Sequence, residues 1–143
     1  MNKSTTPYKI FELMFNNDPF SKLLKMNLVH IDYGQCELSL VVTQDMLNGF
    51  SIAHGGISYA LCDSALAFAA NSYGEQCVSA ETSISHVRPV KAGETIVASV
   101  TEKHKGNRIR IYEVVVKSEA GKTIALFKGI MYNTGKKWEI PGA

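Results

Sequence analysis

The spacing of apolar residues divides this chain into strand-like and helix-like segments. Between residues 28 and 43 apolar side chains recur at every second position, which predicts two strands joined by a turn at Tyr33-Gly34-Gln35. Beyond Gly74 the same period of two predicts further strands at residues 77–87, 95–104, 108–117 and 123–132. The turns between these strands are too short for a parallel crossover, so the sequence predicts an antiparallel sheet.

The remaining pattern predicts two short helices and one long helix. Asp18 followed by Pro19 is typical of an N-cap and a first helical residue, and it opens a short helix over residues 20–25. Gly55-Gly56 opens a long helical run to about residue 73, closed by Gly74. Apolar residues near the start of the chain suggest another short amphipathic helix, at Tyr8, Phe11, Leu13, Met14 and Phe15. The sequence therefore predicts an α+β protein in which one long helix packs on the sheet.

The long helix lacks the charged stripe that a surface helix turns toward water. Between Asp45 and Glu75 the only formally charged residue is Asp63, and most other positions are alanine or larger apolar residues. We therefore expect the sheet to enclose this helix. An aspartate in a helix is ordinarily solvated, but a buried carboxylate is costly unless it is paired or used in chemistry. The pattern makes Asp63 a candidate catalytic residue.

Composition and charge narrow the class of protein. The chain has 143 residues, 45% hydrophobic and 20% charged, which is typical of one globular domain over residues 1–143, with an N-terminal helical segment at 1–26. The net charge of +2 is too balanced to indicate a nucleic-acid or membrane partner. Three widely spaced cysteines, with no apolar leader or membrane-length segment, predict a cytoplasmic protein. The four histidines lack metal-binding spacing, so no metal is expected.

One loop and the helix after it resemble a known family. Their residues resemble the signature of the PaaI-type acyl-CoA thioesterases, at Asn48-Gly49, His54-Gly55-Gly56 and Asp63. A later segment, residues 84–94, is similar to a strand and turn of the same family, at Arg88-Pro89 and Gly93-Glu94. The resemblance covers roughly residues 28–132. It implies the hotdog fold, an antiparallel sheet wrapped around one long central helix, and hydrolysis of an acyl- or aryl-acyl-CoA thioester to free acid and CoA.

The start of the long helix offers groups that thioester hydrolysis needs. The amide of Gly55 is the candidate donor to the developing oxyanion, and Gly56 beside it leaves the approach of a carbonyl open. Asp63 would act either as general base on water or as nucleophile through an anhydride. It lies roughly 12 Å along the same helix, so one helix does not bring both groups to one carbonyl. The resemblance implies that Asp63 of one subunit faces Gly55 of another.

Other polar residues are candidates for positioning. His54 would fix the loop or polarise the carbonyl, and Asn48 would hold substrate or water; the alternatives are a structural histidine and an ordinary turn residue. Ser79 matches a position where some family members place a hydroxyl that orients the water, the alternative being a plain strand serine. The acyl pocket is expected to be lined by the N-terminal helices together with Tyr59, Phe50 and Leu66.

A basic hairpin surrounds Gly106-Asn107, and it contains Lys103, His104, Lys105, Arg108 and Arg110. Lys105 and Arg108, with Arg88 of the family-like segment, are candidates to bind the phosphates of CoA, because lysine and arginine are the usual phosphate partners. The alternative interpretation of the hairpin is a solvated turn.

Two other functions remain open. A hotdog hydratase or dehydratase would act on an acyl thioester with a histidine and a carboxylate across a subunit interface, and a non-catalytic module would bind acyl-CoA without consuming it. CoA is part of the substrate in these interpretations, and no metal or redox cofactor is implied. Because each site needs two chains, we expect a homo-oligomer, either a dimer or a tetramer built as a dimer of dimers.

Overall fold

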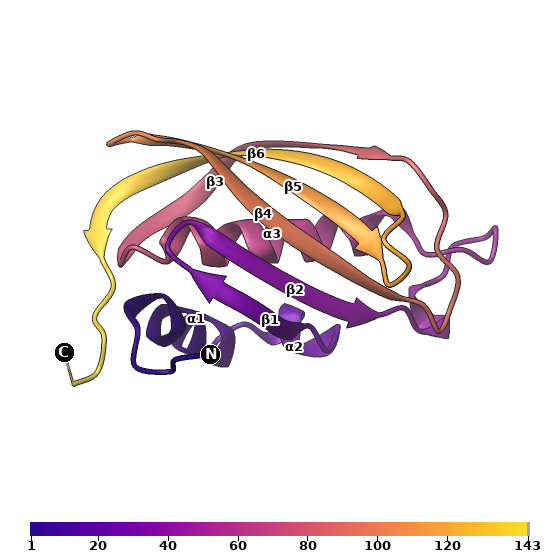
Figure 1. The fold of residues 1–143 in the computed structure, drawn as a ribbon, viewed down its shortest axis with the longest axis horizontal. Helices are drawn as coiled ribbons and strands as arrows, with labels where there is room; N and C mark the ends of the chain where they lie inside the picture. The colour runs from indigo at the N-terminus through magenta and orange to yellow at the C-terminus, as the bar shows by residue number, and fades with distance from the viewer. Residues whose placement is uncertain (143) are drawn as a thin grey trace.

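Six antiparallel strands form one sheet that curves over the long helix α3, Gly55–Asn71 (Figure 1). The computed structural model describes residues 1–142 of the chain. Helices α1 (Thr6–Asn16) and α2 (Pro19–Leu23) come first, and a short 3₁₀ turn (Gln44–Met46) precedes α3. The strands are β1 (Asn27–Asp32), β2 (Gln35–Val41), β3 (Glu75–His86), β4 (Thr95–Lys105), β5 (Ile109–Ser118) and β6 (Thr123–Lys137), in the sheet order β1-β2-β4-β5-β6-β3. This arrangement confirms the predicted α+β architecture.

Some elements end where the sequence pattern did not predict. Helix α3 ends at Asn71 rather than near residue 73, because the next residue already caps it and Gly74, with a φ of +94°, turns the chain into β3. Helix α2 stops at Leu23 rather than at residue 25, since Lys25 has a φ of +53°, outside the right-handed region. Strand β6 continues past residue 132, because Lys137 pairs with the first residue of β3.

Side-chain caps begin both N-terminal helices. The hydroxyl of Thr5 accepts from the amide of Tyr8 at 3.4 Å, and the carboxylate of Asp18 accepts from the amide of Ser21 at 3.0 Å. The second cap confirms the helix start predicted at this position. The Ser21 hydroxyl also lies 2.8 Å from the hydroxyl of Ser64, a hydrogen bond that holds α2 against α3.

Helix α3 is largely enclosed, which confirms the interpretation of its missing charged stripe. Six of its residues are 0% exposed: Leu61, Cys62, Ala65, Leu66, Ala69 and Ala70. At Gly129 of β6 a Cβ atom would collide with the Leu66 side chain, so this glycine lets the helix lie directly on the sheet. One stripe of α3 stays partly exposed, at Gly56, Tyr59, Asp63 and Ala67. The Tyr59 hydroxyl bonds that of Thr82, which places the stripe beside β3.

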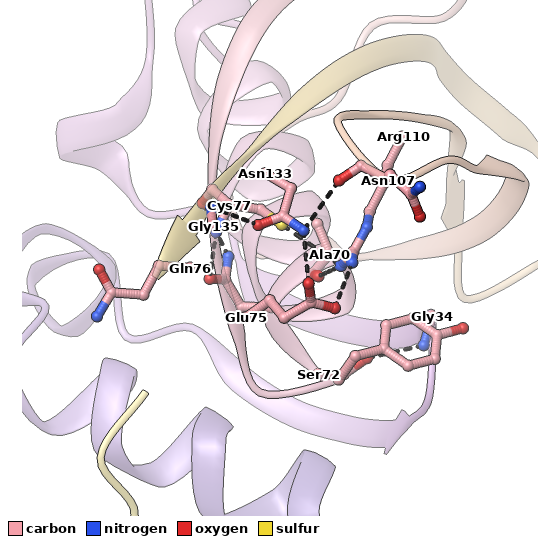
Figure 2. A network of polar contacts seen from close by, with 12 residues as sticks. Gly34, Ala70, Ser72, Glu75, Gln76, Cys77, Asn107, Arg110, Asn133 and Gly135 are labelled. Carbon is pink, nitrogen blue, oxygen red and sulfur yellow. Dashed lines mark hydrogen bonds and ion pairs between the residues drawn. The ribbon is translucent and has the colours of Figure 1, made fainter. Parts of the chain in front are cut away.

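The buried guanidinium of Arg110 ties the C-terminal end of α3 to the sheet and pairs with the partly exposed Glu75 (Figure 2). Arg110 of β5 is only 1% exposed, and its guanidinium donates to the Glu75 carboxylate at 2.7 Å and to the Ala70 carbonyl at 2.9 Å. The Asn133 amide donates to the other Glu75 oxygen at 2.6 Å. The expectation that Arg110 belongs to an exposed basic hairpin is therefore wrong, because its position in β5 points it under the sheet.

The C-terminal segment closes the same end of α3. The buried side chain of Asn71 donates to the Ala67 and Cys77 carbonyls, and its oxygen accepts from the Cys77 amide at 2.9 Å. The same oxygen accepts from the indole of Trp138 at 2.8 Å. The Trp138 amide donates to the Gly74 carbonyl at 2.8 Å. One asparagine thus joins the helix, the start of β3 and the end of the chain.

Because of the Glu75 ion pair, we expect the stability of the fold to decrease in acid. The hydrogen bonds from Asn133 and Arg110 hold the pKa of the Glu75 carboxyl below its ordinary value of 4.5. As the pH falls below that value the unfolded chain binds a proton before the folded chain does, so the contribution of Glu75 is present at neutral pH and is lost in acid. We expect Glu75→Gln to lower the Tm at about pH 7, and the difference from the parent to shrink below about pH 4.5. Thermal melts across this range, with the exposed Glu119→Gln as control, measure it; a difference that stays constant with pH contradicts it.

Candidate active site

The backbone amide of Gly55, the first residue of α3, is free within the described chain. His54 is the N-cap residue, and its Nδ1 accepts from the Gly56 amide at 2.9 Å. The Ile57 amide donates to the His54 carbonyl at 2.9 Å. Within residues 1–142 the Gly55 amide donates to no acceptor. An unpaired amide at a helix N-terminus, where the helix dipole is positive, favours a negative oxygen.

This arrangement separates the roles of the two glycines and of His54. The Gly56 amide already donates to His54, so it is not free to bind substrate as the sequence analysis would require of a Gly56 amide donor. His54 accepts at Nδ1, which assigns the proton of the neutral ring to Nε2. The His54 amide donates to the Met46 carbonyl at 2.8 Å, which fixes the loop ahead of the helix. His54 thus caps the helix and holds the loop, which fits both a structural histidine and the predicted loop-fixing function.

Asn48 forms the turn in the loop before α3. Its side-chain oxygen accepts from the amides of Phe50 at 2.9 Å and Ile52 at 3.4 Å, and its own amide donates to the Ile52 carbonyl at 2.8 Å. Within the described chain the Asn48 side-chain NH₂ has no acceptor, so two donors remain available beside the helix start. Phe50, at the tip of this turn, is 86% exposed.

A cavity of about 450 Å³ is lined in part by Gly55, the residue whose amide is free. Its lining brings together three of the residues predicted from the sequence, namely Asn48, Gly55 and Arg88. Its remaining walls come from the loop, α3 and the end of β3, at Ile52, Ala53, Ser58, His86, Val87, Pro89 and Val90. Arg88 is the only formally charged residue in this lining, and no carboxylate lines it. The cavity is therefore suited to a group that becomes negative during a reaction.

Asp63 lies on the partly exposed stripe of α3, away from that cavity. Burial raises the pKa of its carboxyl above the ordinary value of 3.8. No side chain or amide within residues 1–142 donates a hydrogen bond to it, so the charge is partly desolvated without a partner. Eight residues of helix place it roughly 12 Å from Gly55. One chain therefore does not bring the predicted base and the predicted oxyanion donor together.

Strand β3 beside this stripe has an open edge. It is the last strand in the sheet order, so one side pairs with β6 and the other has no partner strand within the described chain. The exposed Ser79 pairs in register with the buried Met131, so its side chain lies on the helix side of the sheet. It forms no side-chain hydrogen bond within residues 1–142. A long unpaired edge is a surface that proteins ordinarily cover.

The basic hairpin lies at the opposite end of α3 from Gly55. The ammonium of Lys105 lies 4.5 Å from the centre of the Tyr73 ring, just past the end of the helix, and Arg108 is exposed on the turn. The 17 residues of α3 span about 25 Å, so within one chain these cations are far from the cavity at Gly55. Leu66 is fully buried against Gly129, and the expectation that it lines an acyl pocket is wrong.

Two residues near the cavity, His86 and Ser58, were not among those predicted from the sequence. His86 ends β3, and its Nε2 lies 3.0 Å from where a Cβ on Gly55 would stand. Ser58 is 4% exposed and lines the cavity one turn into α3. A signal for His86 was present, because a period of two puts it on the same face of its strand as Ile84.

Other chemistries find little support among the described residues. Cys62 is fully buried, and burial raises the pKa of its thiol to about 12, so it is no thiolate nucleophile. This confirms its interpretation as a core residue. Within residues 1–142 no three His, Cys, Asp or Glu side chains gather as metal ligands would. No helix in this range has both the length and the apolarity needed to cross a membrane.

The chain belongs to the thioesterase superfamily, which residues 50–125 match. Over 122 residues it is 34% identical to the acyl-coenzyme A thioesterase PaaI of Escherichia coli strain K12, a match that covers 85% of this chain and 87% of that protein. The resemblance inferred from the loop and helix motifs is therefore confirmed at the level of the family.

Solved structures agree with this assignment. The structure of the E. coli PaaI protein is 32% identical and matches with a TM-score of 0.90, covering 92% of this chain and 96% of that chain. A protein of Streptococcus mutans, solved bound to acetyl CoA, is 25% identical with a TM-score of 0.77 and covers 80% and 92% of the two chains. These similarities confirm the hotdog fold.

Proposed function

We propose that this protein is an acyl-CoA thioesterase that hydrolyses an acyl- or aryl-acyl-CoA thioester to the free acid and CoA. The observation that carries the proposal is the free amide of Gly55 at a cavity without carboxylates, with the unpaired Asp63 carboxylate on the open stripe of the same helix. The similarity to the E. coli acyl-CoA thioesterase and to a protein solved with acetyl CoA supports the same substrate class.

In the proposed mechanism the thioester carbonyl oxygen accepts a hydrogen bond from the Gly55 amide. Attack on the carbonyl carbon makes this oxygen negative, and the amide with the helix dipole behind it stabilises that charge. Asp63 either removes a proton from the attacking water or attacks the carbon itself, giving an anhydride that water then cleaves. In both routes the carbon–sulfur bond breaks, CoA leaves as the thiolate, and water supplies the oxygen atom that the overall hydrolysis adds.

The proposed site contains two chains. The open edges of β3 in two copies would extend one sheet into the next and bring the exposed stripes of the two α3 helices together in antiparallel orientation. Asp63 of one copy would then approach Gly55 of the other. The uncompensated, partly desolvated charge of Asp63 supports this, because a group of that kind is stabilised when it meets a polar site. A dimer, or a tetramer built from two such dimers, fits this requirement.

The remaining candidates have supporting roles in this proposal. His54 holds the first turn of α3, and Asn48 holds the loop with its donors near the cavity. Ser79, on the helix side of β3, would orient the water. Arg88 borders both the Gly55 cavity and an adjoining pocket of about 410 Å³, and it would bind CoA phosphates there. Lys105 and Arg108 would do so from the partner chain.

A panel of acyl-CoA esters, assayed for release of free thiol, tests the proposed function. We expect thiol release with equimolar free acid, and the acyl type with the highest kcat/KM identifies the preferred substrate. Binding without thiol release favours the non-catalytic module. Loss or gain of water on the acyl chain, with the thioester intact, favours the hydratase or dehydratase. Each of these two results would reject the proposal.

The free amide of Gly55 gives a sharper prediction. Proline is tolerated at the first position of a helix but has no N–H, and the extended backbone of His54 accepts a following proline. We expect the kcat of Gly55→Pro to lie roughly 10²–10³-fold below that of Gly55→Ala, the usual cost of one oxyanion donor. Gly55→Ala is the matched control, since its methyl meets the same neighbours and its amide remains. Equal kcat in the two variants would contradict a role for the amide.

Mixed oligomers test whether the site is shared between chains. Gly55→Pro and Asp63→Asn are each expected to be nearly inactive alone. In a mixed dimer one of the two sites pairs the intact Gly55 of one chain with the intact Asp63 of the other. Random pairing of equal amounts should therefore restore about a quarter of the parent activity. No recovery after confirmed subunit mixing would show that Gly55 and Asp63 do not act across an interface.

A further inference from the structure

The imidazole of His86 lies next to Gly55, the residue whose backbone amide is free. A Cβ atom on Gly55 would lie 3.0 Å from Nε2 of His86 and 3.3 Å from its Cε1. The ring atom nearest to that Cβ position is therefore a nitrogen, which donates a hydrogen bond when it carries a proton. His86 forms no side-chain hydrogen bond within residues 1–142, so both ring nitrogens are available.

The backbone on both sides holds His86 in this position. In β3 it pairs with the buried Ala125 of β6, which turns its side chain toward the helix side of the sheet. Directly after it the amides of Val87 and Arg88 both donate to the Ile124 carbonyl, at 2.8 and 3.1 Å. The paired strand end therefore fixes the backbone from which the ring reaches Gly55, and correctly placed donors are the effective ones in electrostatic catalysis.

We propose that His86 is a catalytic residue that donates a second hydrogen bond, from Nε2–H, to the oxygen held by the Gly55 amide. The inference rests on the proposed thioester hydrolysis and assigns the second half of its oxyanion hole. An oxygen bonded to the Gly55 amide stands beside the Cβ position of that residue, which is where Nε2 of His86 approaches. The proton stays on His86, and only the charge on the oxygen changes during the reaction.

His86 fits this role better than the other histidine at the helix start. His54 uses Nδ1 to accept from Gly56, and it lies at the N-cap rather than in the cavity lining. His86 lines the cavity together with Gly55 and Arg88. A methyl group at position 55 would touch this ring, which would have to shift by a few tenths of an ångström to make room.

Two substitutions separate the hydrogen bond from the bulk of the ring. Phenylalanine keeps a flat ring of similar size without a donor, whereas glutamine places an amide NH₂ near the position of Nε2. We expect His86→Phe to lower kcat by roughly 10²-fold with little change in KM, the cost of one oxyanion donor, and His86→Gln to stay within about tenfold of the parent. The Tm of both variants should stay close to that of the parent, since the ring is exposed.

The experiment measures kcat, KM and Tm of the parent and both variants with the best ester from the thiol-release panel. If the parent is active and the kcat of His86→Phe lies within threefold of the parent value, the assignment of His86 is overturned but the proposed function is not. A His86→Gln variant as slow as His86→Phe has the same consequence, because a retained donor must rescue the rate. A parent that releases no thiol from any ester overturns the proposed function, and the assignment of His86 with it.

Discussion

Asp63→Asn is expected to lower kcat for acyl-CoA hydrolysis by roughly 10²–10⁴-fold without harming the fold. The amide has the size of the carboxylate but no basic oxygen to activate water or attack the carbonyl. Burial raises the pKa of Asp63, so the unfolded chain releases this proton at lower pH than the folded chain does. At neutral pH the charged carboxylate therefore costs stability, and its removal should leave the Tm unchanged or higher.

Three measurements on one preparation distinguish the possible roles of Asp63: kcat, Tm, and binding of a non-hydrolysable acyl-CoA analogue. If the Asp63 carboxylate were only structural, its replacement would lower the Tm and the activity of the protein together. The matched control is Asp45→Asn, which removes an exposed carboxylate ahead of the same helix and should keep full activity. A well-folded Asp63→Asn variant with kcat within about fivefold of the parent would rule out the catalytic assignment.

Arg110→Met is expected to cause the largest loss of stability. Methionine fills a similar space but removes the guanidinium that donates to the Glu75 carboxylate and the Ala70 carbonyl. Removing one member of a buried ion pair costs ~3 kcal/mol at the lower end of the usual range, and that end applies here because Glu75 is partly exposed and keeps its hydrogen bond from Asn133. For a domain of this size the Tm should fall by about 10 °C.

Arg108→Met is the control for this prediction, because it removes the same group from the exposed turn two residues earlier. Its Tm should stay within about 2 °C of the parent, as is usual for surface changes. Calorimetric or circular-dichroism melts of both variants give the comparison. Equal changes in Tm for the two variants would contradict a stabilising role for Arg110 and would favour the solvated-turn interpretation of the hairpin.

The long helix could be predicted because its signals are local. An absent charged stripe, an opening glycine pair and one isolated aspartate are visible within about one helix length of sequence. The motif around Gly55 and Asp63 also indicated the family to which the chain belongs. Whether these two residues meet depends on a second chain, which is why the sequence indicated an oligomer but left its geometry to the family resemblance.

Arg110 and His86 were harder to assign, because their partners come from distant segments. Arg110 stands among lysines and another arginine in the sequence, yet it pairs with Glu75 across the sheet. The period of two in its strand does place it on the same face as Tyr112 and Val114, both buried, and this signal outweighs the local charge. His86 meets Gly55 only because β3 runs antiparallel to α3.

The enclosure of α3 has a consequence for how the chain is made. The helix leaves the ribosome before β3–β6, which supply four of the six strands of its sheet, and before Trp138, which closes its end. Until those segments emerge, a helix without a charged stripe exposes apolar surface, the kind of surface that drives aggregation and that chaperones bind. The native fold therefore cannot be completed until β6 and Trp138 have been synthesised, and a nascent chain halted within β6 would be a substrate for quality control.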